Sequence, residues 1–77
     1  MARELVRHLA SHLVEHPEKL EIREEEVGGH RQIHLSVHPE DRRSLIGDGG
    51  STARALRTIV RAAGEMQERR FLLKIEE

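Results

Sequence analysis

The sequence contains no cysteine, no tryptophan and no tyrosine, and only one phenylalanine among its 77 residues. Without cysteine, disulfide bonds, thiolate metal sites and cysteine nucleophiles are excluded. With so few aromatic side chains, the core must be built mainly from aliphatic residues. The N-terminal region also lacks a long apolar run, because charged residues interrupt it from Arg3 onward. Neither a signal peptide nor a membrane span is therefore predicted, and the expectation is a cytoplasmic protein with one domain over residues 1–77.

The chain also lacks a large net charge, since 13 Lys and Arg residues oppose 14 Asp and Glu residues, giving −1 with histidine neutral. The charges are unevenly distributed along it. Residues 1–38 carry −2 and residues 65–77 carry −1, whereas residues 39–64 contain five Arg against three acids and carry +2. This basic segment is the part of the chain that suits an anionic partner such as a nucleic acid.

The first half of the chain is predicted to form one helix and two strands. Apolar residues recur at helical spacing over 2–15, and His16-Pro17 is predicted to end that helix because the residue before proline disfavours helical backbone. Alternation of apolar and polar residues predicts strands over 20–26 and over Ile33–Val37. Gly28-Gly29 supplies the turn between them, so the two strands are expected to pair as an antiparallel hairpin.

The second half is predicted to form two helices and a last strand. Pro39 begins a short helix that ends with Gly47 in the left-handed conformation, and Ser51 or Thr52 caps a long helix that runs to about residue 67. The buried face of the long helix is expected to consist of Leu56, Ile59, Val60, Ala63 and Met66. A strand over 71–76 completes an α+β fold of order α-β-β-α-α-β, a three-stranded mixed sheet with Ile33–Val37 central and three helices on one face.

The connection between the two later helices is the most informative part of the sequence. A Gly-x-x-Gly turn, Gly47-Asp48-Gly49-Gly50, lies between Ile46 and Ser51. Backbone N–H groups and the positive end of a helix dipole at such a point favour an anion, phosphate above all. Taken alone, the motif is more typical of an ordinary turn between helices. Its place between the two helices of this α-β-β-α-α-β order favours contact with a ligand.

A family resemblance is carried by this motif together with the element order. On these features the chain resembles a type II KH domain. The stretches VHPED at 37–41 and ARALRT at 53–58, with ELV at 4–6 and LVEHPE at 13–18, are similar to the small bacterial one-domain KH proteins of the KhpA (YlqC-like) family. The resemblance covers essentially the whole chain.

The resemblance implies an RNA-binding protein that acts as an RNA chaperone. It also implies a homodimer, or a heterodimer with a second KH protein of the KhpB kind, and in some bacteria a link to cell shape. The Gly-x-x-Gly loop would clamp the backbone of single-stranded RNA, with the strand Ile33–Val37 bordering a groove for about four nucleotides. The implied RNA-binding residues are Arg43, Ile46, Gly47, Asp48, Gly49, Gly50, Ser51, Arg54 and Arg57.

One residue of the loop departs from the family pattern. Relatives carry Lys or Arg in the loop where this chain has Asp48, and Ser44 stands where a Lys is common. A carboxylate near a phosphate repels it by roughly 1 kcal/mol at a protein surface. An alternative hypothesis is therefore a protein-interaction module that dimerises and has weakened or lost RNA binding. Its candidate contact points are Ala55, Ala62 and Leu72.

The six histidines form two series, His8, His12 and His16 in the first helix and His30, His34 and His38 along a strand. Histidines four apart on a helix can share a metal ion, but no cysteine or carboxylate pair completes a site nearby in sequence. Histidines four apart on a strand are about 13 Å apart and cannot share one ion. The sequence therefore predicts no metal site and no cofactor. It also contains no nucleophile motif, so a binding protein is expected and not an enzyme.

Overall fold

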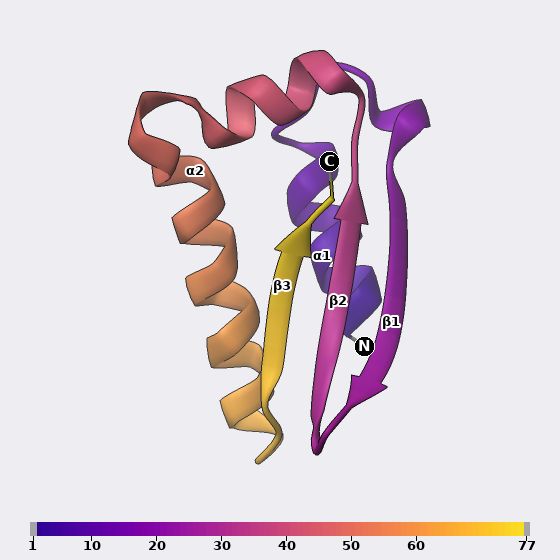
Figure 1. Cartoon of the computed structure of the whole chain (residues 1–77), viewed down its shortest axis with the longest axis vertical. Helices are drawn as coiled ribbons and strands as arrows, with labels where there is room; N and C mark the ends of the chain where they lie inside the picture. The colour runs from indigo at the N-terminus through magenta and orange to yellow at the C-terminus, as the bar shows by residue number, and fades with distance from the viewer. Residues whose placement is uncertain (1, 77) are drawn as a thin grey trace.

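A computed structural model describes the backbone of residues 2–76 and the side chains of residues 3–47 and 50–76. The chain folds into a layer of helices against a three-stranded sheet (Figure 1). In the described part, no helix combines the length and the apolar character needed to cross a lipid bilayer. The elements are α1 (Ala2–Ser11), η1 (Pro17–Lys19), β1 (Glu21–Val27), β2 (His30–Ser36), α2 (Pro39–Met66) and β3 (Phe71–Ile75).

The sheet confirms the predicted topology. Its strand order is β1-β2-β3, with β1 antiparallel to β2 and β2 parallel to β3. Gly28 and Gly29 form the hairpin turn with φ of 53° and 88°. Two successive residues with positive φ are typical of the type I′ turn, whose twist matches that of paired strands. The central strand is therefore β2, as the alternation of its residues predicts.

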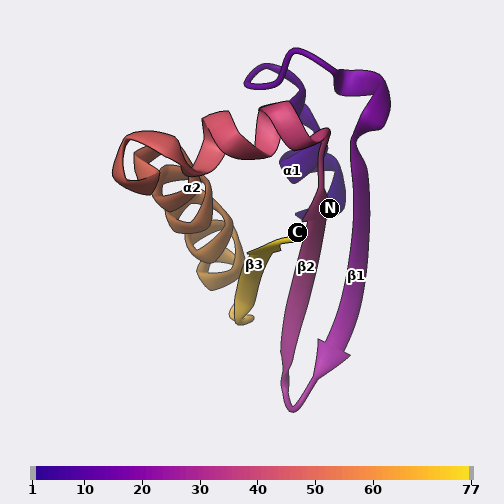
Figure 2. The same ribbon diagram turned by 45° about the horizontal axis from the view of Figure 1, so that its top comes forward.

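The core lies between the helices and one face of the sheet, and the two views in Figures 1 and 2 show α1 and α2 on that same side. Ile33 and Leu35 of β2 are fully buried at its centre. Burying an aliphatic side chain of this size contributes roughly 1.5–3 kcal/mol. Around them pack Val6, Ala10, Leu20, Ile22, Leu45, Ala53, Leu56, Val60, Phe71, Leu73 and Ile75.

Helix α2 is bent, and its two arms correspond to the two helices that the sequence predicts. Figure 1 shows the first arm crossing the end of the sheet and the second arm running down beside β3. Helical structure is continuous from Pro39 to Met66, but Gly50 has φ +74°. The prediction that Gly47 takes the left-handed conformation is wrong, since the positive φ is found at Gly50 and not at Gly47. Glycine adopts such a backbone without steric cost, so the bend falls at the last residue of the motif.

The first helix is shorter than predicted, because α1 ends at Ser11 and not near residue 15. The chain leaves the helix axis so that the backbone N–H groups of Glu15 and His16 can donate to the carboxylate of Asp41, at 2.8 and 3.0 Å. Asp41 is 3% exposed and lies in the first turn of α2. This buried carboxylate attaches the segment after α1 to the start of α2.

The inward face of the second arm also differs from the prediction. Leu56 and Val60 are buried, but Ile59 and Met66 are 43% and 87% exposed. A Cβ added to Gly64 would lie 2.9 Å from both the carbonyl oxygen of Arg69 and Cγ of Phe71. The helix approaches β3 so closely that only glycine fits there. The inward face therefore also contains the small residues Ala53 and Gly64, which the spacing of large apolar residues does not indicate.

Candidate nucleic-acid interface

Two buried residues fix the orientation of the first arm of α2. Asp41 and Leu45 are 3% and 1% exposed, and they hold one side of the arm against the core. The side chains of Arg43 and Ile46 therefore point outward, and Ile46 is 40% exposed. An exposed isoleucine and an exposed arginine therefore lie on the outer side of this arm.

The glycines at the bend have open surroundings. A Cβ added to Gly47 or to Gly50 would have no heavy atom within 4 Å, so a ligand can approach the backbone at both residues. Ser51 follows the bend and is exposed. Asp48 and Gly49 are not among the residues whose surroundings the structure describes, so their assigned roles remain predictions. Helical structure runs through the motif. That backbone N–H groups at the motif donate to a phosphate also remains a prediction.

The second arm carries positive charge away from the core. Ala53, Leu56 and Val60 are buried, so the intervening positions Arg54 and Arg57 are exposed. These arginines follow Gly50 by about one and two helical turns. The structure thus places exposed arginines on both arms of α2, on either side of the bend.

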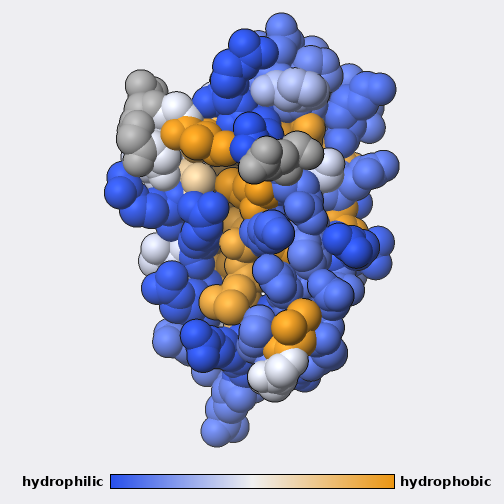
Figure 3. Space-filling model, in the orientation of Figure 1, coloured by the Kyte–Doolittle hydropathy of each residue, from blue (hydrophilic) through white to orange (hydrophobic). Residues whose placement is uncertain are grey.

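A strip of hydrophobic surface lies next to the bend on one face of the molecule. Figure 3 shows an orange strip that runs from the bent end of α2 down between the second arm and the strands, with hydrophilic residues on both sides. The strand beside α2 is β3, because β2 is paired on both edges. Ile33 and Leu35 of β2 are fully buried, so their side chains do not reach a ligand. That Ile33–Val37 borders the site remains a prediction, and β3 is the strand nearest to the second arm.

An ion-pair network that the sequence did not indicate lies on the sheet face opposite the helices. His34 of β2 is 8% exposed, and its Nδ1 and Nε2 atoms lie 2.7 Å from Glu76 Oε1 and 3.0 Å from Glu25 Oε1. The hydrogen bond from His34 lowers the pKa of the Glu76 carboxyl below its usual value. This network links Glu25 of β1 and His34 of β2 to Glu76, the residue directly after β3.

A second network fastens the hairpin. Arg31 of β2 contacts Glu26 of β1 at 2.7 Å, and Arg69, just before β3, contacts the same Glu26 oxygen at 2.9 Å. Hydrogen bonding from Arg31 lowers the pKa of the Glu26 carboxyl and raises that of the Arg31 guanidinium. Arg31 and Arg69 are thus engaged in ion pairs within the protein.

An apolar hollow of about 440 Å³ lies between α1 and the second arm of α2. Leu13 and Ile59, which are 47% and 43% exposed, line it together with Ala55. Of the contact points that the sequence suggested, Ala55 therefore lies in this hollow. Leu72 lines a different one, between the end of α2 and β3, and Ala62 is exposed on α2. Leu13 and Ile59 were missed because helical spacing assigned both to the core.

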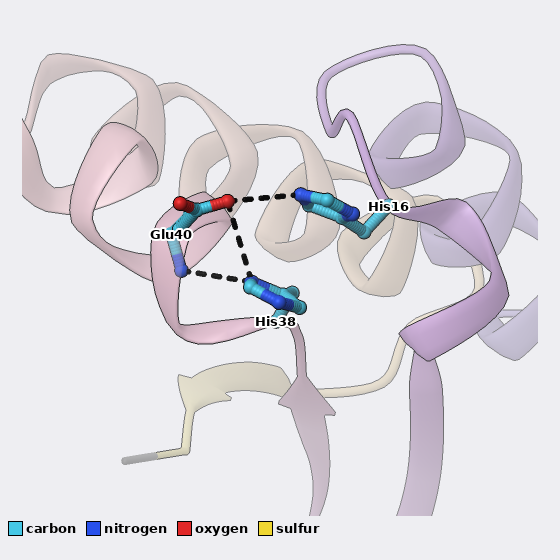
Figure 4. A group of neighbouring side chains, drawn as sticks. All are labelled: His16, His38 and Glu40. Carbon is cyan, nitrogen blue, oxygen red and sulfur yellow. Dashed lines mark hydrogen bonds and ion pairs between the residues drawn. The ribbon is translucent and has the colours of Figure 1, made fainter.

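The two histidine series meet in space at one point. His16 belongs to the first series and His38 to the second, and their rings stack with centroids 4.0 Å apart (Figure 4). Glu40 lies beside both, with its Oε1 atom 3.1 Å from His16 Nε2. No spacing within either series indicates this contact, because the residues come from segments more than 20 positions apart.

Comparison with known proteins identifies close relatives. The family model described as KhpA/KhpB, KH domain, matches residues 3–75. The RNA-binding protein KhpA of Halalkalibacterium halodurans is 46% identical over 71 residues, which cover 92% of this chain and 93% of the relative. The proteins of the same name from Caldanaerobacter subterraneus subsp. tengcongensis and from Bacillus subtilis are 39% and 36% identical, covering 94% of this chain and 96% and 89% of the relatives.

Proposed function

Because this chain belongs to the KhpA/KhpB KH domain family, we propose that it is an RNA-binding protein that holds single-stranded RNA at the bend of α2. The relatives that match over nearly their whole length are named RNA-binding proteins. The resemblance recognised in the sequence agrees with this family. The proposed contacts are those of the sequence-based assignment, Arg43, Ile46, Gly47, Asp48, Gly49, Gly50, Ser51, Arg54 and Arg57.

The observation that carries the proposal is the open backbone at Gly47 and Gly50 between two arms that bear exposed arginines. A phosphate group approaches a backbone most closely where no Cβ intervenes. Arg43 precedes Gly47 by about one turn, and Arg54 follows Gly50 by about one turn. An RNA backbone laid across the bend therefore meets positive charge on both sides.

The strip of hydrophobic surface beside the bend supports contact with bases. Ile46, just before the Gly-x-x-Gly motif, is exposed, and β3 is the strand nearest to the second arm. Aromatic stacking contributes little here, because Phe71, the sole aromatic residue apart from the histidines, is 3% exposed. We expect binding to depend mainly on phosphate contacts, with weak sequence preference and strong dependence on salt. Weak preference suits an RNA chaperone that acts on many RNAs.

The direct test is fluorescence anisotropy of a labelled single-stranded RNA titrated with the full chain at two salt concentrations. We expect binding at micromolar protein that weakens as salt rises, since each phosphate contact releases counterions. Arg57→Gln is expected to weaken binding by roughly threefold to tenfold and to reduce the salt dependence. Arg70→Gln removes the same charge from an exposed position before β3 and serves as the control. Absence of binding at low salt by a folded sample contradicts the proposal.

A second candidate function is self-association, with or without RNA binding. The apolar hollow lined by Leu13, Ala55 and Ile59 favours it, because exposed aliphatic groups that cluster on one surface are typical of protein contacts. The occupant that we propose is a second copy of this chain or a KH-type partner of the KhpB kind. The two candidates use different surfaces, so a variant at the hollow separates one from the other.

A further inference from the structure

The contact between His16, His38 and Glu40 supplies ligands of a kind that transition metals prefer. His16 lies immediately before η1, whereas His38 and Glu40 lie at the start of α2 (Figure 4). One nitrogen from each ring and one oxygen of the carboxylate all lie within 4.8 Å of one another. Imidazole nitrogen and carboxylate oxygen are standard zinc ligands, and two histidines with one carboxylate form a recurrent three-ligand set.

We propose that His16, His38 and Glu40 bind a divalent transition-metal ion, with zinc as the preferred occupant. Ligands at about 2.0–2.2 Å around a tetrahedral ion lie about 3.3–3.5 Å apart. Glu40 Oε1 is 3.1 Å from His16 Nε2 and 4.0 Å from His38 Nδ1, so both separations are within about 0.7 Å of that requirement. Both rings are about one-third exposed, so modest side-chain rotations bring the three atoms around one ion.

The protein backbone already holds these ligands together. Asp41, next to Glu40, accepts a hydrogen bond from the backbone N–H of His16 at 3.0 Å. The same carboxylate is 3% exposed and accepts a second bond from Glu15. This buried anchor joins the segment of His16 to the turn of α2 that carries the other two ligands. Little conformational order therefore remains to be acquired when an ion binds.

The surroundings of the cluster favour a cation. Glu18 Oε2 lies 3.7 Å from His16 Nδ1, on the side of the ring away from Glu40. A carboxylate behind a metal-ligating histidine orients the ring and raises its basicity. The neighbouring Arg42 is directed elsewhere, because its Nε atom donates to the backbone carbonyl of Glu76 at 3.2 Å. The charges nearest the three ligands are thus predominantly negative.

Metal binding requires His38 to give up one hydrogen bond. Its Nδ1 atom accepts a hydrogen bond from the backbone N–H of Glu40 at 3.1 Å and thereby caps α2. An ion at this nitrogen displaces that bond, and the exposed N–H group then donates to water. The exchange and the exposure of the ligands limit affinity to a moderate range. The ion would connect the chain before β1 to the first arm of α2, so it should also stabilise the native state by mass action.

The test is titration of the full chain, without a histidine tag, with ZnCl₂ in a calorimeter, and with CoCl₂ followed by visible absorption. We expect one equivalent of metal to bind. We further expect His16→Gln, His38→Gln and Glu40→Gln each to weaken binding at least about tenfold, and Glu18→Gln to weaken it by less. The matched control is His12→Gln, because His8 of α1 and His12 just after it are a second histidine pair, with ring centroids 4.7 Å apart.

A second measurement needs no variant. Histidine ring resonances of the wild-type chain are followed by NMR during the zinc titration, and those of His16 and His38 are expected to shift while those of His8 and His12 stay in place. The proposal is overturned if zinc does not bind at millimolar concentration. It is equally overturned if His12→Gln weakens binding as much as His38→Gln, or if the resonances of α1 are the ones that move.

Discussion

The backbone N–H group of His16 donates a 3.0 Å hydrogen bond to Oδ2 of Asp41, across 25 positions of sequence. Oδ1 of the same carboxylate accepts the N–H of Glu15 at 2.8 Å. Both donors belong to a segment without regular structure, which has no helix or strand partner for them. Asp41 thus replaces the backbone partners that secondary structure would provide, and it defines where the chain goes after α1.

Replacing Asp41 should destabilise the fold. Asp41→Ala leaves two partly buried N–H groups without an acceptor, and we expect a loss of about 2–4 kcal/mol in the free energy of unfolding. Asp41→Asn keeps one carbonyl oxygen and should lose less. Urea denaturation followed by circular dichroism measures both values, with Glu65→Ala at an exposed position of α2 as the reference. A midpoint for Asp41→Ala equal to that of Glu65→Ala contradicts the assigned role.

Two glycines of α2 should respond to alanine in opposite directions. A Cβ at Gly64 meets backbone and ring atoms at 2.9 Å, so Gly64→Ala must displace β3 from the helix and should cost about 1–3 kcal/mol. Gly47 is helical with nothing within 4 Å of the added Cβ, so Gly47→Ala should stabilise by about 0.5–1 kcal/mol. The midpoints of thermal unfolding of the two variants and of the wild type measure these changes in stability. Equal effects at the two sites would show that helix approach to β3 does not matter.

The pair formed by His34 and Glu76 predicts a dependence of stability on acid. The pKa of Glu76 is lowered from 4.5 in the folded chain, chiefly by the hydrogen bond from His34. Its contribution to stability is therefore present above the unfolded value of 4.5 and is lost as the pH falls through the lower folded value. Glu76→Gln should be less stable than the wild type at pH 6, and the difference should shrink as the pH drops below 4.5.

Urea midpoints measured between pH 6 and pH 2.5 test this dependence. Glu65→Gln removes a carboxylate from an exposed position of α2 and supplies the control. A difference between Glu76→Gln and the wild type that stays constant across this range would show that ionisation of Glu76 does not contribute.

Reversing the charge in the loop should strengthen RNA binding. Asp48→Lys replaces a repulsive charge with an attractive one next to the proposed phosphate path, and affinity at low salt should rise about tenfold or more. The gain should diminish as salt screens the new contact. Glu65→Lys makes the same change of charge on the second arm, away from the bend. Anisotropy titrations that show equal gains for the two variants would assign the effect to net charge alone.

Introducing a charge into the apolar hollow should prevent self-association. Ile59→Asp places a carboxylate among Leu13 and Ala55, and we expect the average mass at high protein concentration to fall to that of the monomer. Met66→Asp is the matched control, since Met66 is 87% exposed and does not line the hollow. Sedimentation equilibrium compares both with the wild type. A monomeric wild type, or an equal effect of Met66→Asp, argues against this surface.

The order of elements, the antiparallel hairpin and the parallel final strand are all apparent from the sequence. Alternating residues in β2 and the double glycine of the hairpin turn are local signals, and local signals survive in any context. The predictions of where α1 ends and of which residues of α2 face the core were less accurate. α1 ends early because of Asp41, a residue 25 positions beyond His16, and α2 turns Ile59 outward because Gly64 approaches β3.

For the candidate interface, the sequence by itself determined the residue types at the bend and the exposure of the arginines of α2. These follow from helical periodicity and from a motif that is contiguous in the chain. Only the tertiary structure decided that Gly50 takes the positive φ, that β3 lies beside α2, and that His16 meets His38 and Glu40. Such features depend on contacts between distant segments, whose approach is set by packing of the whole core and not by the spacing of nearby residues.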